Sequence, residues 1–180
     1  HLLGAKNCPK LKFLPYPPRS MTWWLGNNDL VLPERGFGKL SSSTLPSKMK
    51  ITDCSFSQDK WDRLQHFATI EKFLVNSVSG LRTLPEVIRC FTSLTRLDLV
   101  SLKDLETLPV WLGHLGSLQV FEIQDCPNLT CLPESMKKLT ALTDLTLIEC
   151  KGLETLPEWL GQLTSLEEVI IRDCPSLTSL

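Results

Sequence analysis

The chain has 180 residues, of which 42% are hydrophobic and 22% are charged, with 19 basic and 20 acidic side chains. A formal net charge of −1 argues against nucleic-acid binding, because no excess of Lys and Arg is present to neutralise phosphates. The sequence contains no apolar run of the ~20 residues that a membrane-spanning helix needs, and no basic-then-apolar leader. The length fits one ordinary domain.

Residues 1–59 contain short strand-like segments separated by turn-forming residues. Residues 8–15 match the end of a repeat found later in the chain, and residues 49–54 resemble a strand followed by a cysteine. Residues 21–25 predict one more strand. Pro, Gly, Asn and Ser are frequent between these segments and favour turns. We therefore expect irregular leucine-rich repeats with a loop-rich, partly ordered excursion in residues 1–59, and no second domain.

Residues 60–180 repeat with a period of 24. Each row opens with a Leu-Pro pair, and the rows begin at Leu84, Leu108, Leu132 and Leu156. Apolar residues recur in fixed columns, one of which contains Leu97, Phe121, Leu145 and Val169. The chain stops on Leu180, where a fifth row starts, without a polar capping unit. We therefore expect the regular repeats to be truncated at the carboxy terminus and the chain to be a fragment of a longer protein.

Each row predicts one short strand and one short helical turn. Residues 142–147 end in an apolar–polar alternation that indicates a strand, and residues 157–163 have three-to-four spacing after a proline. One unit alone cannot bury enough apolar surface to fold, so successive units must stack. The pattern predicts an α/β solenoid, a leucine-rich-repeat horseshoe. Its parallel strands form the concave face, and short helical or 3-10 turns form the convex face.

Three of the seven cysteines form a column that predicts buried, reduced thiols. Cys126, Cys150 and Cys174 occupy one column, and Leu102 and Val78 occupy the same column in earlier rows. Interchange with Leu and Val indicates an apolar position. The side chains of this column point in the same direction into the core, which opposes disulfide formation, and no Cys/His spacing suits a metal. Unpaired buried thiols favour a reducing compartment and predict a cytoplasmic location.

No residue pattern predicts catalysis. Residues 36–39, Gly-Phe-Gly-Lys, lack the spacing of a phosphate-binding loop. His66 and His114 fall in a column that faces outward on the convex side, with no nucleophile beside it. We predict that the chain is not an enzyme and holds no metal or cofactor. Trp111 and Trp159 are expected to cover the convex surface between helical turns, and a docking patch for another domain is the alternative.

The outward-facing strand positions predict the binding surface. The last three rows carry six acidic side chains and one basic side chain there. Asp125, Glu149 and Asp173 form one column with ~5 Å spacing, so their charges should repel one another. Two interpretations stay open: a solvated face, or a recognition patch for a basic protein surface, which exposed apolar neighbours favour. The candidate protein-binding residues are Arg96, Asp98, Val120, Glu122, Gln124, Asp125, Asp144, Thr146, Ile148, Glu149, Glu168, Ile170, Arg172 and Asp173.

Two segments resemble a known family. Residues 153–166, Leu-Glu-Thr-Leu-Pro-Glu-Trp-Leu-Gly-Gln-Leu-Thr-Ser-Leu, and residues 173–180, Asp-Cys-Pro-Ser-Leu-Thr-Ser-Leu, are similar to repeats of plant nucleotide-binding leucine-rich-repeat (NLR) disease-resistance proteins of the coiled-coil class. The resemblance covers about residues 60–180. It implies a module that holds an ATPase switch off and recognises a pathogen effector, directly or through a guarded host protein. It implies ADP or ATP binding only for a nucleotide-binding domain outside this sequence.

Other repeat proteins remain as alternatives. Plant cell-surface receptors share the 24-residue period but usually carry Leu-x-Gly-x-Ile-Pro, which is absent here. An intracellular leucine-rich-repeat scaffold and a ubiquitin-ligase substrate adaptor are the two other candidates. The expected partners are proteins: a pathogen effector, a guarded host protein, or the switch domain of the parent chain. Neither nucleic acid nor a membrane is expected as a partner.

Overall fold

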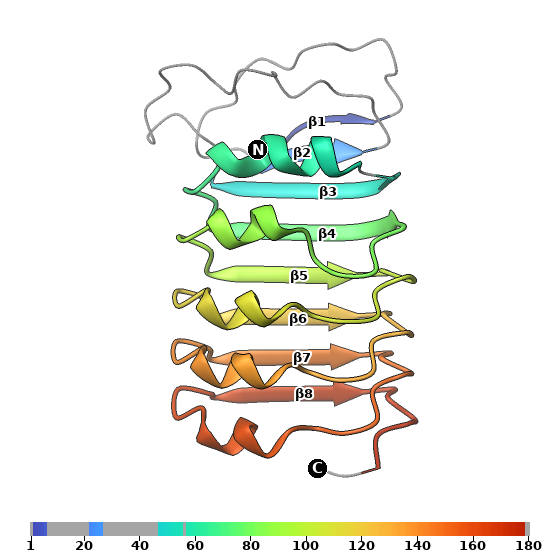
Figure 1. Ribbon diagram of the computed structural model, residues 1–180, viewed down its shortest axis with the longest axis vertical. Helices are drawn as coiled ribbons and strands as arrows, with labels where there is room; N and C mark the ends of the chain where they lie inside the picture. Colours follow the sequence, from blue (N-terminus) through green and yellow to red (C-terminus); the bar gives the residue numbers. More distant parts are fainter. Residues whose placement is uncertain (1, 7–21, 27–46, 56, 179–180) are drawn as a thin grey trace.

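The computed structural model of the chain describes residues 2–6, 22–26, 47–55 and 57–178. Within these residues, eight parallel strands form one sheet whose order follows the chain (Figure 1). The strands are β1 (Leu2–Lys6), β2 (Thr22–Gly26), β3 (Lys48–Ser55), β4 (Lys72–Ser79), β5 (Arg96–Val100), β6 (Val120–Gln124), β7 (Asp144–Ile148) and β8 (Glu168–Arg172). The predicted strands at residues 21–25 and 49–54 are confirmed as β2 and β3. The predicted features at residues 8–15 and 36–39 lie outside the described residues.

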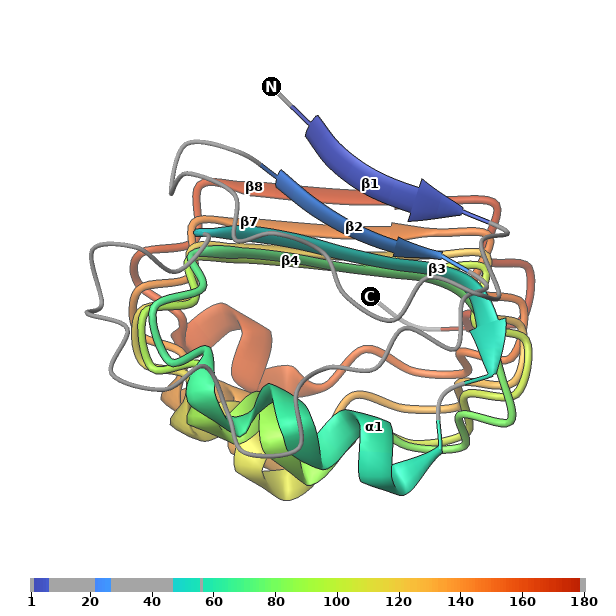
Figure 2. The ribbon, with the colours of Figure 1, turned by 90° about the horizontal axis from the view of Figure 1, so that it is seen from above.

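Short helical turns lie on one side of the sheet, and the other face of the sheet points away from them (Figure 2). They are α1 (Gln58–Asp62), η1 (Arg63–His66), η2 (Glu86–Cys90), η3 (Val110–His114), η4 (Glu134–Lys138) and η5 (Glu158–Gln162). A proline with extended backbone precedes each of η2 to η5, as Pro85 does for η2. The N–H of Ile88 donates to the carbonyl of Pro85 at 3.1 Å, which is the three-residue reach of a 3-10 turn. The predicted α/β solenoid is confirmed.

The separation between paired strands is constant over most of the sheet. From β3 to β8, each residue pairs with one that lies 24 positions later, as Lys48 does with Lys72 and Asp144 with Glu168. The separation is 20 residues between β1 and β2 and 26 between β2 and β3. A constant separation places equivalent side chains directly over one another, so the columns of the sequence become columns in space.

These columns form one continuous core between the sheet and the helical turns. Leu97, Phe121 and Leu145 are 0% exposed in adjacent strands. Aromatic rings link neighbouring rows, since the Phe73 and Phe91 rings meet edge to face with centroids 5.2 Å apart. The stack therefore holds each leucine between neighbours from the row before and the row after.

The last row is less covered than the sequence pattern predicts. Val169 belongs to the buried column of Leu145, but its side chain is 44% exposed. Ile171 is only half-buried. The cause is positional, because within the described residues no strand packs on the far side of β8. Burial in this column depends on a following row as well as on the side chain itself.

The cysteine column forms a ladder of thiols along the core. The thiol of Cys126 donates to the carbonyl of Gln124 at 3.5 Å, and that of Cys150 donates to Ile148 at 3.6 Å. Both residues are free and fully buried, as predicted. Burial raises the pKa of Cys126 to about 11 and that of Cys150 to about 12, because desolvation disfavours the thiolate. Cys174 is free but only partly buried, since it lies in the last row.

Trp111 and Trp159 pack against the core from the convex side. Their side chains are 8% and 3% exposed, respectively. Little ring surface therefore remains for docking another domain. His66 and His114 are exposed in the same layer of turns, as predicted.

Candidate protein-binding face

The open face of the sheet is built from alternate strand residues. In β5, β6 and β7 the first, third and fifth residues are half-buried and the two between them are buried. We call the first, third and fifth positions of β3–β8, with the residue after the fifth, the concave face. All the predicted binding residues lie on it. Val120, Ile148 and Ile170 were expected to be exposed but are half-buried, because neighbouring strands cover their flanks.

One position in every row has a left-handed backbone. Six non-glycine residues have φ between 50° and 54°: Asp53, Ser77, Ser101, Asp125, Glu149 and Asp173. In three of these rows the N–H donates to a carbonyl of the next row: Ser101 to Gln124 at 2.9 Å, Asp125 to Ile148 at 2.8 Å and Glu149 to Arg172 at 2.9 Å. The hydrogen bonds offset the cost of a conformation that side chains with a Cβ disfavour. The row therefore ends with a side chain held at the rim of the concave face.

Asp125 is paired, although the sequence predicted repulsion in its column. Its carboxylate accepts a hydrogen bond from the ammonium of Lys103 and another from the Ser101 hydroxyl at 2.9 Å. The hydrogen bond from Lys103, helped by Ser101, holds the pKa of Asp125 below its usual value. The neighbouring cation therefore outweighs any repulsion from the acidic column at this position.

Arg96 neutralises two more of the predicted acids. Its Nε donates to the Asp98 carboxylate at 2.9 Å, and its Nη2 donates to Glu122 in the next strand at 2.7 Å. The hydrogen bond to Asp98 is the largest cause of the raised pKa of Arg96. Asp98 and Glu122 therefore offer less charge to a partner than the sequence suggested. The acidic residues of the face that form no ion pair with any described residue are Asp144, Glu149, Glu168 and Asp173, which we call the acidic end.

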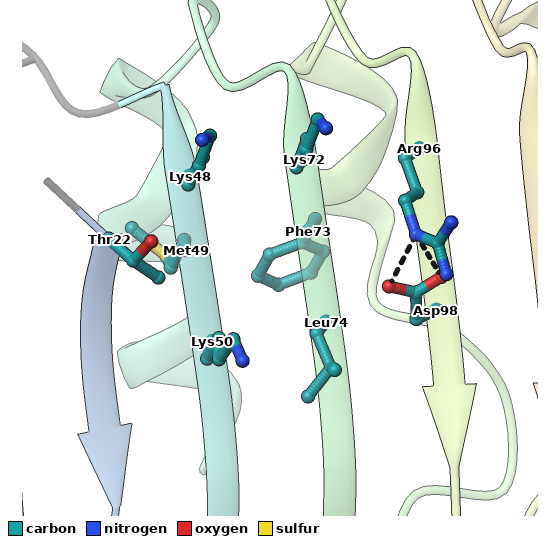
Figure 3. A pocket seen from close by; sticks show the side chains of 9 residues that line it. All are labelled: Thr22, Lys48, Met49, Lys50, Lys72, Phe73, Leu74, Arg96 and Asp98. Carbon is teal, nitrogen blue, oxygen red and sulfur yellow. Dashed lines mark hydrogen bonds and ion pairs between the residues drawn. The ribbon is translucent and has the colours of Figure 1, made fainter. Parts of the chain in front are cut away.

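The other end of the face is basic, and sequence reasoning did not include it among the candidate site residues. Lys48 and Lys50 project from β3 and Lys72 projects from β4, and we call these three lysines the basic end (Figure 3). They line a pocket of ≈ 270 Å³ together with Thr22, Met49, Phe73, Leu74, Arg96 and Asp98. The missed signal was present: Lys48 and Lys50 flank Met49 in the predicted strand and lie 24 residues before Lys72 and Leu74.

The comparisons with known proteins concern the fold. No protein-family model and no curated protein matched the sequence. Among solved structures, the chain is similar to the leucine-rich repeat domain of the type III effector XopL, with a TM-score of 0.53. The two are 19% identical, and the match covers 81% of this chain and 65% of that one. The chain has the leucine-rich-repeat fold. This fold is typically a non-catalytic scaffold for protein–protein interaction.

Charge changes sign along the leucine-rich-repeat stack. The first outward position of successive strands is occupied by Lys48, Lys72, Arg96, Val120, Asp144 and Glu168, each in register with the next. Three cations are thus followed by one apolar residue and two anions. Lys48, Lys50 and Lys72 outnumber Asp53 at β3 and β4, and the four carboxylates of the acidic end outnumber Arg172 at β7 and β8. The concave face therefore has a net positive charge at one end and a net negative charge at the other.

The described residues contain neither a metal-binding cluster nor a membrane-spanning helix. In the part of the chain that the structure describes, no group of three His, Cys, Asp or Glu side chains is placed to hold a metal ion. No helix among the described residues is long and apolar enough to cross a membrane.

Proposed function

We propose that the chain is a protein-recognition module that binds a basic protein surface with the acidic end of its concave face. The observation that carries this proposal is the set of four carboxylates without an ion pair among the described residues. Half-buried Ile148 and Ile170 lie between them and supply apolar contact area. Charges of one sign raise the association rate and select complementary partners, and apolar neighbours add contact energy.

We also propose a biological setting for this module, namely the ligand-sensing and autoinhibitory repeat region of a plant intracellular immune receptor. The resemblance of residues 153–166 and 173–180 to NLR repeats supports this setting. The free, buried thiols of Cys126 and Cys150 are compatible with a reducing compartment such as the cytoplasm. The partner would be a pathogen effector, a guarded host protein, or the switch domain of the parent chain, and any ADP or ATP would bind outside this sequence.

The size of the face limits the expected affinity. Five strands at ~4.8 Å spacing and five residues per strand give about 24 Å by 16 Å, or on the order of 400 Å². A standard interface buries about 800 Å² on each partner. We therefore expect this chain alone to bind with micromolar or weaker affinity. Because the contacts are charged and near the surface, added salt should weaken the binding further.

The test reverses two charges of the acidic end. We expect Glu149→Lys together with Asp173→Lys to leave the circular dichroism spectrum unchanged and to abolish recognition. The wild-type and variant chains are used to capture proteins from pathogen-challenged leaf extract, and bound proteins are compared by quantitative mass spectrometry. A partner that supports the proposal is retained by the wild type, lost by the variant, and released by salt.

A matched control carries the same charge change away from the face. Glu154→Lys together with Glu158→Lys alters two exposed acids in the loop and turn before β8. This control should retain the partner. Capture of the same proteins by the Glu149/Asp173 variant would show that the acidic end is only a solvated surface. Capture of core ubiquitin-ligase subunits in place of an effector or guarded protein would favour a substrate adaptor over an immune receptor.

A further inference from the structure

We propose that the concave face fixes the direction in which its partner binds. The partner is one protein with an acidic segment and a basic segment. Its acidic segment contacts the basic end of the face, and its basic segment contacts the acidic end. This inference rests on the proposed function and deepens it. It adds a second contact site, at Lys48, Lys50 and Lys72, and it defines the partner as a segment with opposite charges at its two ends.

The three lysines of the basic end are available to a ligand. None of them forms an ion pair with another described residue. Lys48 and Lys72 are partners in the β3–β4 register, so their backbones lie about 4.8 Å apart. Ammonium groups carried on adjacent strands can come within the Debye length of ~8 Å, where like charges repel. An anion placed between them relieves that repulsion and is therefore favoured.

Arg96 and Asp98 limit the pocket on its β5 side. The guanidinium of Arg96 is already engaged by Asp98 and Glu122, so it contributes little free positive charge. A ligand carboxylate is consequently directed away from Asp98 and toward the lysines of β3 and β4. Figure 3 shows this division, with the Arg96–Asp98 pair on one strand and the lysines on the two strands before it.

The lining of the pocket suits an acidic side chain. Its volume of ≈ 270 Å³ is enough for one Glu side chain. Leu74 pairs with Lys50 in register, so an apolar wall lies beside an ammonium group. The methylene groups of a Glu side chain would contact Leu74 while the carboxylate meets a lysine. This chemistry describes an acidic peptide segment.

The two ends are far enough apart to act separately. Five strand spacings separate Lys48 from Glu168, or about 24 Å, which is three times the Debye length. A helical partner needs about 16 residues at 1.5 Å per residue to reach both ends. When this helix binds in one direction, each of its ends contacts protein charges of the opposite sign. When it binds in the reverse direction, each of its ends contacts charges of the same sign. The face therefore distinguishes the two directions.

Shape selects a different protein over a second copy of this chain. A two-fold axis along the strands would place Lys48 opposite Glu168 and Lys72 opposite Asp144, so the charges alone permit self-association. Figure 2 shows, however, that the sheet is curved, with β1 and β8 raised above β3 and β4 on the side away from the helical turns. Two sheets that curve in this way meet only at their edges, whereas a helix or another convex surface follows the curvature.

The test uses two synthetic helical peptides of about 18 residues, each with a Glu-rich amino half and a Lys-rich carboxy half. One carries a nitroxide at its acidic end and the other carries it at its basic end. Paramagnetic broadening of backbone amide signals is measured in the ¹⁵N-labelled chain. We expect the acidic-end label to broaden the amides of β3 and β4, and the basic-end label to broaden those of β7 and β8.

Charge exchange on the protein provides the decisive variant. Lys48→Glu with Lys72→Glu should weaken peptide binding at least ~10-fold, because attraction becomes repulsion at one end. Replacing Lys50 by Glu as well, together with Lys at Asp144, Glu149, Glu168 and Asp173, reverses every charge of the basic end and the acidic end. This fully charge-reversed variant should restore the affinity and invert the broadening pattern. Lys138→Glu with Glu158→Lys, which exchanges charges on the exposed convex turns, should change neither. Circular dichroism checks that each variant is folded.

The outcomes separate this inference from the proposed function. Equal broadening at both ends of the sheet, or an unchanged pattern in the fully charge-reversed variant, would overturn the fixed direction. Dimers of the free chain in sedimentation equilibrium that dissociate in the Lys48/Lys72 variant would assign the face to a second copy instead. The proposed function fails separately, if leaf proteins are captured independently of Glu149 and Asp173.

Discussion

Substitution of Leu145 by alanine tests the register on which the whole face depends. Leu145 is 0% exposed in β7 and lies between Phe121 of β6 and Val169 of β8. Three buried carbons are removed, at about 0.8 kcal/mol each, which gives a transfer loss of about 2.4 kcal/mol. A residual cavity of ~40 Å³ would add about 1 kcal/mol. We expect the free energy of unfolding to fall by about 3–4 kcal/mol in urea denaturation followed by circular dichroism.

Two neighbouring substitutions complete this experiment. Asp144→Ala, one residue earlier and on the concave face, should cost less than ~0.5 kcal/mol. Val169→Ala, in the same column as Leu145 but 44% exposed, should cost less than ~1 kcal/mol. Equal losses at Leu145 and Asp144 would refute the register, because a shift of one residue exchanges the two faces of a strand. A loss at Val169 as large as at Leu145 would show that another surface covers β8.

Three further predictions concern the thiols, the charged rim and the left-handed position. Iodoacetamide should label exposed Cys90 rapidly in the native chain but Cys126 only after unfolding, because burial raises the pKa of Cys126 to about 11. Rapid labelling of Cys126 in the native chain, detected by mass spectrometry, would contradict this prediction. Lys103→Ala should raise the lowered pKa of Asp125 in an NMR titration and cost less than ~1 kcal/mol. The lowered pKa of Asp125 stabilises the folded chain at pH values above the unfolded carboxyl pKa of about 3.9, and this stabilisation is lost as the pH falls through the folded pKa. The cost of Lys103→Ala should therefore be present at pH 7 and vanish in strong acid. A cost that does not depend on pH would exclude the ion pair as its source. Glu149→Asn should raise the free energy of unfolding by up to ~1 kcal/mol in thermal unfolding, because Asn tolerates the left-handed backbone better than Glu does. A lower free energy of unfolding would show that the left-handed φ of Glu149 does not limit stability.

The regular part of the fold could be predicted because the 24-residue period shows which residues face inward. Alternation at residues 142–147 placed Leu145 in the core, and the prolines placed the helical turns. The left-handed residue of each row could not be predicted in this way. Ser101 and Glu149 carry no glycine or asparagine signal, and their conformation is imposed by a backbone hydrogen bond to the next row.

The candidate site was predicted less completely than the fold. Sequence columns show which side chains share the concave face, but not which of them neutralise one another. Arg96 reaches across to Glu122, and Lys103 reaches from a loop to Asp125 in the next row, so both pairs depend on side-chain conformation. The basic end was missed because the register was not extended back to β3, where the 24-residue separation still holds.

The constant spacing of the rows also has a consequence for how the chain folds. Every pairing from β3 to β8 closes a chain segment of the same length, so each step of growth carries a similar loop-closure entropy. No pairing must wait for a distant part of the sequence, and a folded row provides a template for the next. Folding can therefore begin at any adjacent pair of rows and spread in both directions. On the ribosome, each row should dock onto its predecessor as soon as about 24 further residues have emerged.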